Sequence, residues 1–356
     1  KNLFANVKDI NLKQTSFIYL IKKDSGEIDN IRSFVNGLQI NSGNIEFNNS
    51  KSLKIKGDLK SDFNLNKSNI ENLLKKTLLQ KFKNIEINGK IQSLFSINFD
   101  ETLKVINYKL ETSGNIKKSK IKFKKPQQYL FINDKIKDFS LEKTDFKINL
   151  NKDNKKSFNI SGSYKLNNNQ LQKFNLKNIY DSNSQLLSLN GDLNNEILIP
   201  LFNYNSKDKI INLSIESEVK KDSIKIKQLI LTEEKNRISI DNLIINDKKL
   251  VKLDSISIKT FTNGEYNNDF NVNFGKIIKV KGSKYDATNL TKLLEEKNNF
   301  NFLQNISKEI SINLKEVSTN VSDKIFNFNF IGYMEKGKFN KIISKGEFND
   351  GKYLDI

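Results

Sequence analysis

Apolar and polar residues alternate with a period of two over most of this chain. One segment places Ile211, Leu213, Ile215 and Val219 on one side and Asn212, Ser214, Glu216 and Glu218 on the other. The same alternation sets three more apolar pairs against polar neighbours: Ile224 and Ile226, Ile238 and Ile240, and Ile256 and Ile258. This pattern predicts β-strands with one apolar and one wet face.

A Gly-centred pattern recurs along the strands in the order apolar, polar, Gly, polar, apolar. Its copies are centred on Gly57, Gly89, Gly162 and Gly191, about 30 residues apart in two cases. That spacing matches one β-hairpin per repeat. Because glycine within a strand often marks a bulge or bend, we predict that the repeat curves the sheet.

Two segments break the strand pattern with helical spacing. Residues 68–83 carry apolar residues on one helical face, and Ser68 with Glu71 fits a capping box. Residues 288–297 repeat this device, and a third short helix is possible around 302–308. We therefore predict a mainly β fold: an elongated, curved antiparallel sheet of repeating hairpins with two or three short helices. It forms one continuous region over 1–356, with no clear internal boundary.

Hydrophobic residues make up only 37% of the 356 residues, which is low for a chain with one large core. Disorder is disfavoured by 25 Phe and 10 Tyr at regular intervals. The pattern leaves two arrangements open. Either the apolar faces line an open groove, or they meet in a filled sandwich or barrel.

The formal net charge of +19 indicates attraction to an anionic partner or simply a Lys-rich composition. The strongest basic strip is 116–125, where Lys120, Lys122 and Lys124 share one strand face. Its aromatic residue, Phe123, points the other way, so no stacking surface for bases is expected. We predict that the partner is not a nucleic acid.

The chain offers little catalytic chemistry. It contains no His and no Cys, and no Asp-rich loop has the spacing of a calcium site. Adjacent acids such as Glu233 and Glu234 would point to opposite strand faces, so we expect them at the solvated surface. We predict a non-enzymatic protein without cofactor or metal. The longest apolar run near the start, Phe17–Ile21, is far too short to span a membrane.

The segment Val280–Leu294 (VKGSKYDATNLTKLL) resembles a signature of the AsmA-like superfamily of bacterial envelope proteins. There a strand leads through Gly and an Asp-Ala pair into a short Leu-rich helix. The matching residues are Gly282, Asp286, Ala287, Leu290, Leu293 and Leu294. The Gly-punctuated strands elsewhere are also similar, as pattern more than as identity.

This resemblance implies a long β-groove that carries phospholipids between the inner and outer membranes. It also implies a periplasmic location and an inner-membrane anchor, which we expect upstream of Lys1. Acyl chains would lie on the apolar faces. The groove candidates are Ile211, Leu213, Ile215, Val219, Ile224, Ile226, Ile238, Ile240, Ile256 and Ile258. The partners would be phospholipid, bacterial membranes and unspecified envelope proteins.

Two alternatives stay open. An envelope scaffold or outer-membrane assembly factor would receive a client strand at an exposed sheet edge. A surface or adhesive β-repeat protein would instead have a filled interior.

Overall fold

The computed structural model describes all residues except 1–2, 8–9, 36–37, 72–78, 130–131, 153–155, 181–182, 208, 248, 291–306, 321–323 and 337. Most of them are β-strand, which confirms the predicted fold class. The chain divides into two compact units. The first comprises Lys1–Gln128 and Lys135–Leu189, and the second comprises Tyr129–Asp134 and Asn190–Ile356.

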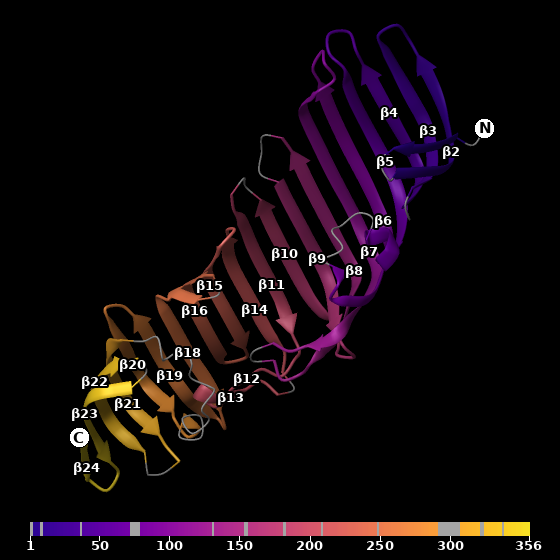
Figure 1. Cartoon of the computed structure of the whole chain (residues 1–356). Helices are drawn as coiled ribbons and strands as arrows, with labels where there is room; N and C mark the ends of the chain where they lie inside the picture. Colours follow the sequence, from indigo (N-terminus) through magenta and orange to yellow (C-terminus); the bar gives the residue numbers. More distant parts are fainter. Residues whose placement is uncertain are drawn as a thin grey trace. The chain divides into compact units, whose positions relative to one another are not determined.

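The first unit is a succession of antiparallel strands, each paired with the next along the chain (Figure 1). The strands are β1 (Leu3–Val7), β2 (Ile10–Ile21), β3 (Ser25–Val35), β4 (Leu38–Asn48), β5 (Lys54–Asn66), β6 (Phe82–Phe99), β7 (Val105–Gln127), β8 (Ile136–Asn151), β9 (Lys156–Leu166) and β10 (Gln172–Tyr180). This ladder is the one that a hairpin repeat predicts. The next strand, β11 (Gln185–Leu193), contains the division between the units.

The second unit begins with a short hairpin followed by a ladder of strands. The hairpin comprises β12 (Leu198–Ile199), the 3-10 turn η1 (Pro200–Phe202) and β13 (Tyr204–Asn205). The ladder contains β14 (Ile211–Val219), β15 (Ser223–Glu233), β16 (Asn236–Asn246), β17 (Lys249–Lys252), β18 (Ser255–Thr262), β19 (Glu265–Phe274), β20 (Ile277–Asp286), β21 (Lys308–Ser318), β22 (Ile325–Glu335), β23 (Lys338–Phe348) and β24 (Tyr353–Asp355). Neighbours from β14 to β20 are antiparallel, with β16 paired to both β17 and β18.

One pair departs from the antiparallel prediction. β20 and β21 are parallel, with Ile278 opposite Ile310 and Val280 opposite Ile312. Parallel neighbours need a crossover of a dozen or more residues, and residues 287–307 provide it. The helix predicted over 288–297 falls in this connection. Thr288 and Asn289 form a turn and Leu290 is helical, while 291–297, like most of 302–308, lies outside the described residues.

The other predicted helix is described only at its ends. α1 spans Lys67–Glu71, Leu79 is also helical, and β6 already begins at Phe82, so the prediction of helix to residue 83 is wrong at its end. Ile70 and Leu79 bury their side chains with Ile85 of β6. The apolar side of this segment therefore covers one end of the first unit's sheet.

Strand glycines at Gly89 and Gly282 lie at register shifts, which fits the predicted bulges. Other strand glycines have a further role in packing. Among the described glycines, the positive φ values belong to Gly264 and Gly351, both in turns. In the ladder, Gly57 pairs with Phe95, and a Cβ at Gly57 would collide with the Phe95 ring. Gly114 meets Phe146 in the same way. These glycines leave room for the aromatic ring of the paired strand to lie over the backbone.

Candidate functional site

The ten groove candidates lie on one face of four neighbouring strands in the second unit. Side chains directly opposite each other in a ladder share a face of the sheet. Leu213 lies opposite Leu231, which lies opposite Ile238, and Ile238 lies opposite Ile258. The same relation links Ile215 through Leu229 to Ile240 and Ile256.

A β-bulge keeps Ile224 and Ile226 on this face. Simple alternation along β15 would turn them away from Leu229, because an even number of residues lies between: two after Ile226 and four after Ile224. The register between β14 and β15 shifts at Glu216/Ser217, where β15 carries one extra residue. Ile226 and Ile224 consequently lie opposite Ser217 and Val219, which alternate regularly with Ile215. The bulge therefore restores the apolar face.

The apolar row continues far beyond these four strands. From Ile256 the direct partners are Val272 on β19, Val280 on β20, Ile312 on β21 and Phe330 on β22. An unbroken line of large apolar side chains thus crosses eight strands, from β14 to β22. We call the side of the second unit's sheet that carries this row its apolar face.

The first unit has its own apolar rows. One row runs from Ile45 across β5 to Phe95, Leu110 and Leu150. Gly57 stands between Ile45 and Phe95, with the ring lying over it. Both units thus have apolar rows of the same kind, with the Gly-centred pattern in the first unit and without any glycine in β14 to β19 of the second.

Most of these side chains are half-buried. Ile215, Ile240, Val272 and Val280 in the second unit are neither fully buried nor fully exposed, and the same holds for Phe95 in the first. Neighbours on the same face shield each of them in part. Fully buried apolar clusters occur instead where a helical segment or the strap described next covers the face.

A strap crosses one side of the apolar face in the second unit. It comprises residues 195–209 and contains β12, η1 and β13. Ile197 and Tyr204 of the strap form a buried cluster with Ile211 and Ile238. Phe202 packs edge-on against Phe270, with ring centroids 6.1 Å apart. The strap therefore covers the strand ends near Ile211, Glu233, Asn236, Thr260 and Asp286, which together we call the strap rim.

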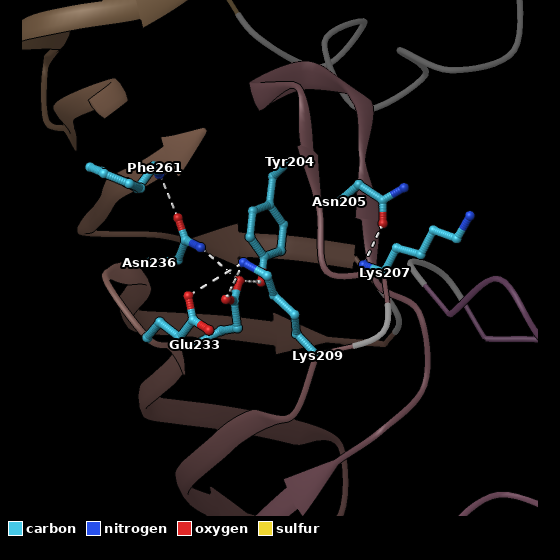
Figure 2. Close-up of polar contacts among 8 residues, drawn as sticks. Tyr204, Asn205, Lys207, Lys209, Glu233, Asn236 and Phe261 are labelled. Carbon is cyan, nitrogen blue, oxygen red and sulfur yellow. Dashed lines mark hydrogen bonds and ion pairs between the residues drawn. The ribbon is translucent and has the colours of Figure 1, made fainter. Parts of the chain in front are cut away.

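Glu233, at the end of β15, anchors the strap by hydrogen bonds to its residues (Figure 2). Its carboxylate accepts hydrogen bonds from the Tyr204 hydroxyl at 3.3 Å, the Lys209 ammonium at 2.9 Å and the Asn236 amide at 2.6 Å. Burial and the neighbouring carboxylate raise the pKa of Tyr204 well above its ordinary value, so the hydroxyl stays a donor. The prediction of a solvated Glu233 is wrong, because the strap covers this residue.

Asp286 forms a second anchor at the end of β20. Its carboxylate accepts hydrogen bonds from the Asn203 amide in the strap (2.9 Å), the Asn267 amide (3.3 Å), and the hydroxyl (2.6 Å) and backbone N–H of Thr288. Partial burial would raise the pKa of Asp286, but these hydrogen bonds outweigh it and lower the pKa. The Thr288 N–H donates to the Asp286 carboxylate two residues earlier, which is the hydrogen bond of an Asx turn.

Other family-signature residues lie beside this anchor. Ala287 is buried in the cluster of Ile258, Phe270 and Leu314, and Leu290 packs against it. At Gly282 an added Cβ would lie about as close to the Asp269 carbonyl oxygen as to Phe270, so only glycine fits this close approach. Leu293 and Leu294 lie outside the described residues. The signature segment thus builds the strap rim.

The basic strip on β7 faces acids on both neighbouring strands. Lys120 lies opposite Glu86, Lys118 opposite Glu142 and Lys122 opposite Asp138. Opposite charges at directly paired positions attract each other and reduce the net field of the strip. It therefore offers a weaker attraction to anions than the sequence alone indicates.

Within the described part of the chain, no cluster of three or more acidic residues could hold a metal ion. Over the same residues, no helix is long and apolar enough to cross a membrane. No known family model matches the sequence, and no characterised protein matches it either.

Proposed function

We propose that this chain binds phospholipid on its apolar faces and moves it between membranes without chemistry. The observation that carries this proposal is the unbroken row from Ile215 on β14 to Phe330 on β22, with most of its side chains half-buried. Each CH₂ group that leaves water gains about 0.8 kcal/mol. An acyl chain laid on this row would therefore bind through apolar area alone.

The same geometry favours movement over fixed binding. The row repeats one kind of contact from strand to strand, at about 4.8 Å per strand. Successive positions are therefore close in free energy, and a lipid could pass from one strand to the next. The resemblance to the AsmA-like superfamily supports transport between the inner and outer bacterial membranes, in the periplasm. Those assignments belong to the proposal.

Crosslinking to a photoactivatable phospholipid tests the binding surface. Purified protein is irradiated with a phospholipid that carries a diazirine in its acyl chain. We expect Ile215→Asp to reduce crosslinking at least fivefold, because a carboxylate in the row must stay hydrated. Ser214→Asp is the matched control, since its side chain points to the other face and crosslinking should persist. Equal crosslinking in both variants would refute the proposal.

A second candidate function is supported by the edge strand β2. Its residues Phe17–Ile21 are all exposed, between 39% and 65%. β3 pairs with Ile18–Ile21 on one side, and β1 pairs only as far as Thr15 on the other. Among the described strands, none pairs with that second side. An exposed apolar edge of this kind accepts added strands, as an assembly factor for outer-membrane proteins would require.

This candidate predicts binding of an unfolded outer-membrane β-barrel protein at β2. Ile18→Lys should weaken that binding at least tenfold, because lysine on an edge opposes strand addition. Val251→Lys on the short strand β17 is the control, since Val251 has a similar exposure. If neither variant changes client binding, the edge does not carry this function.

A further inference from the structure

The two sides of the second unit's apolar face differ in a way that would orient a bound lipid. Apart from the short strand β17, each strand from β14 to β20 has one end at the strap rim and the other at the opposite side, which we call the free rim. The free rim includes Val219, Ile224, Ile245 and Phe274. We infer that phospholipid lies here with its acyl ends toward the strap rim and its headgroup at the free rim. This inference rests on the proposed function.

In the part of the face formed by β15 to β18, burial falls from the strap rim to the free rim, whereas on β20 Ile278, opposite Phe274, is buried at the free rim. Ile258 is 1% exposed beside the strap, whereas Ile224 is 41% exposed. Beyond it, Leu250 and Val251 of β17 are more than half exposed. The strap rim is therefore dry and enclosed, which suits the apolar end of a lipid. The free rim opens to water at Ile224, Leu250 and Val251, and a headgroup needs such contact with water.

The two carboxylates of the strap rim, Glu233 and Asp286, are already engaged within the protein. The Glu233 carboxylate accepts hydrogen bonds from Tyr204, Lys209 and Asn236. Asn203 and Asn267 donate to Asp286. A headgroup placed here would have to displace these hydrogen bonds.

Exposed lysines lie at both rims: Lys207 is in the strap and Lys235 is in the turn between β15 and β16, while the hairpin tips of the free rim carry others. Lys221 lies between β14 and β15, Lys276 between β19 and β20, and Lys336 between β22 and β23. Lysine ammonium groups attract phosphate as point charges. Acidic residues such as Asp222 lie among these lysines, so attraction of a phosphate is confined to the immediate surroundings of each ammonium group.

The width of the face fits this orientation. β14 has nine residues between the two rims, or roughly 26 Å at about 3.3 Å per residue. One leaflet of a bilayer has about 15 Å of hydrocarbon. An acyl chain laid along the strands therefore fits between the strap and the free rim, with its headgroup near the hairpin tips.

Fluorescence quenching in single-cysteine variants tests the orientation, and the absence of native Cys makes each label unique. Bimane is attached at Ile224→Cys on the free rim or at Ile199→Cys in the strap. Each labelled protein is loaded with phospholipid carrying a nitroxide on the headgroup or near the acyl terminus. Circular dichroism confirms that both variants keep their strand content.

We expect the headgroup nitroxide to quench the Ile224→Cys label at least twofold more than the Ile199→Cys label. The acyl-terminal nitroxide should show the reverse preference. Quenching at both sites without this preference, or with the opposite one, would overturn the orientation and leave lipid binding standing. Absence of quenching by either lipid at either site would overturn the proposed function itself.

Discussion

The strap rim and the free rim of the second unit are built from the same kind of strand residue, yet they have different environments. Ile258 and Ile224 both belong to the apolar face, but only Ile258 lies beneath a covering segment. Polar anchors at Glu233 and Asp286 hold that cover in place. Alternation thus makes an apolar face, whereas long-range polar contacts decide which part of the face is closed.

The largest effect should come from placing a charge at each rim. Ile258→Asp should destabilise the second unit by roughly 4 kcal/mol, because a buried carboxylate there has no partner. Ile224→Asp makes the same chemical change where water can reach it and should cost less than about 1 kcal/mol. Urea unfolding followed by circular dichroism measures both. Equal losses would break the comparison between the rims.

The anchor at Glu233 should be the next most sensitive point. Glu233→Ala removes the acceptor for three donors and should cost about 2–3 kcal/mol. Glu234→Ala is the matched control, because the Glu234 side chain is 74% exposed while that of Glu233 is 1% exposed. An exposed acid of this kind contributes less than about 1 kcal/mol. Thermal melts should therefore separate the two variants, and coinciding melts would show that the strap is not held at Glu233.

Two glycines on the apolar face extend the comparison to packing. At Gly282 a new Cβ would meet backbone atoms of β19, which cannot move aside, so Gly282→Ala should cost about 2–3 kcal/mol. At Gly332, opposite Ile310, the nearest atoms are the outer ring atoms of Phe330 and Phe339. Because those rings can shift, Gly332→Ala should cost about 1 kcal/mol or less. Urea midpoints of the two variants provide the measurement, and a costlier Gly332→Ala would contradict this view of the two rims.

The smallest effect concerns acid. Asp286 has a lowered pKa in the folded state, so its contribution to stability is present above the ordinary value of 3.8 and is lost as pH falls through the lower folded pKa. Asp286→Asn should therefore reduce the loss of stability below that value. Asp254→Asn at the free rim is the comparison: Lys252 lowers the pKa of Asp254 as well, but solvent screens this half-exposed pair, so the change should be smaller than for Asp286→Asn. Melting temperatures measured between about pH 2 and 5, a range around the mean Asp pKa, test this prediction. If wild type and Asp286→Asn lose stability identically as pH falls, Asp286 does not contribute to the acid sensitivity.

The strand ladders and the apolar face could be predicted from the sequence because alternation is a local property. Even the bulge has a local trace, since the adjacent polar residues Lys227 and Gln228 separate Ile226 from Leu229. The sequence did not reveal that β20 and β21 run parallel. Direction along a sheet depends on how the connecting segment crosses, which period-two alternation does not encode.

The strap was not predictable in this way. The strap, residues 195–209, is a short segment without a regular apolar period. Its anchors, Glu233 and Asp286, lie far away in sequence. Asn203 reaches Asp286 across 83 positions. Glu233 is likewise indistinguishable from its neighbour Glu234 in sequence, although one is enclosed and the other is not. Pro200 was the one visible signal, as a break in the strand pattern.

Native mass spectrometry of the purified chain tests the central claim most directly. The account predicts phospholipid bound to the wild-type protein, and its loss from a variant carrying both Ile215→Asp and Ile240→Asp. The control, Ser214→Asp, should retain the lipid because the change lies on the other face. A wild-type protein that binds no phospholipid when it is supplied, or a double variant that binds as much as the wild type, would contradict the claim that the apolar face is a lipid-binding surface.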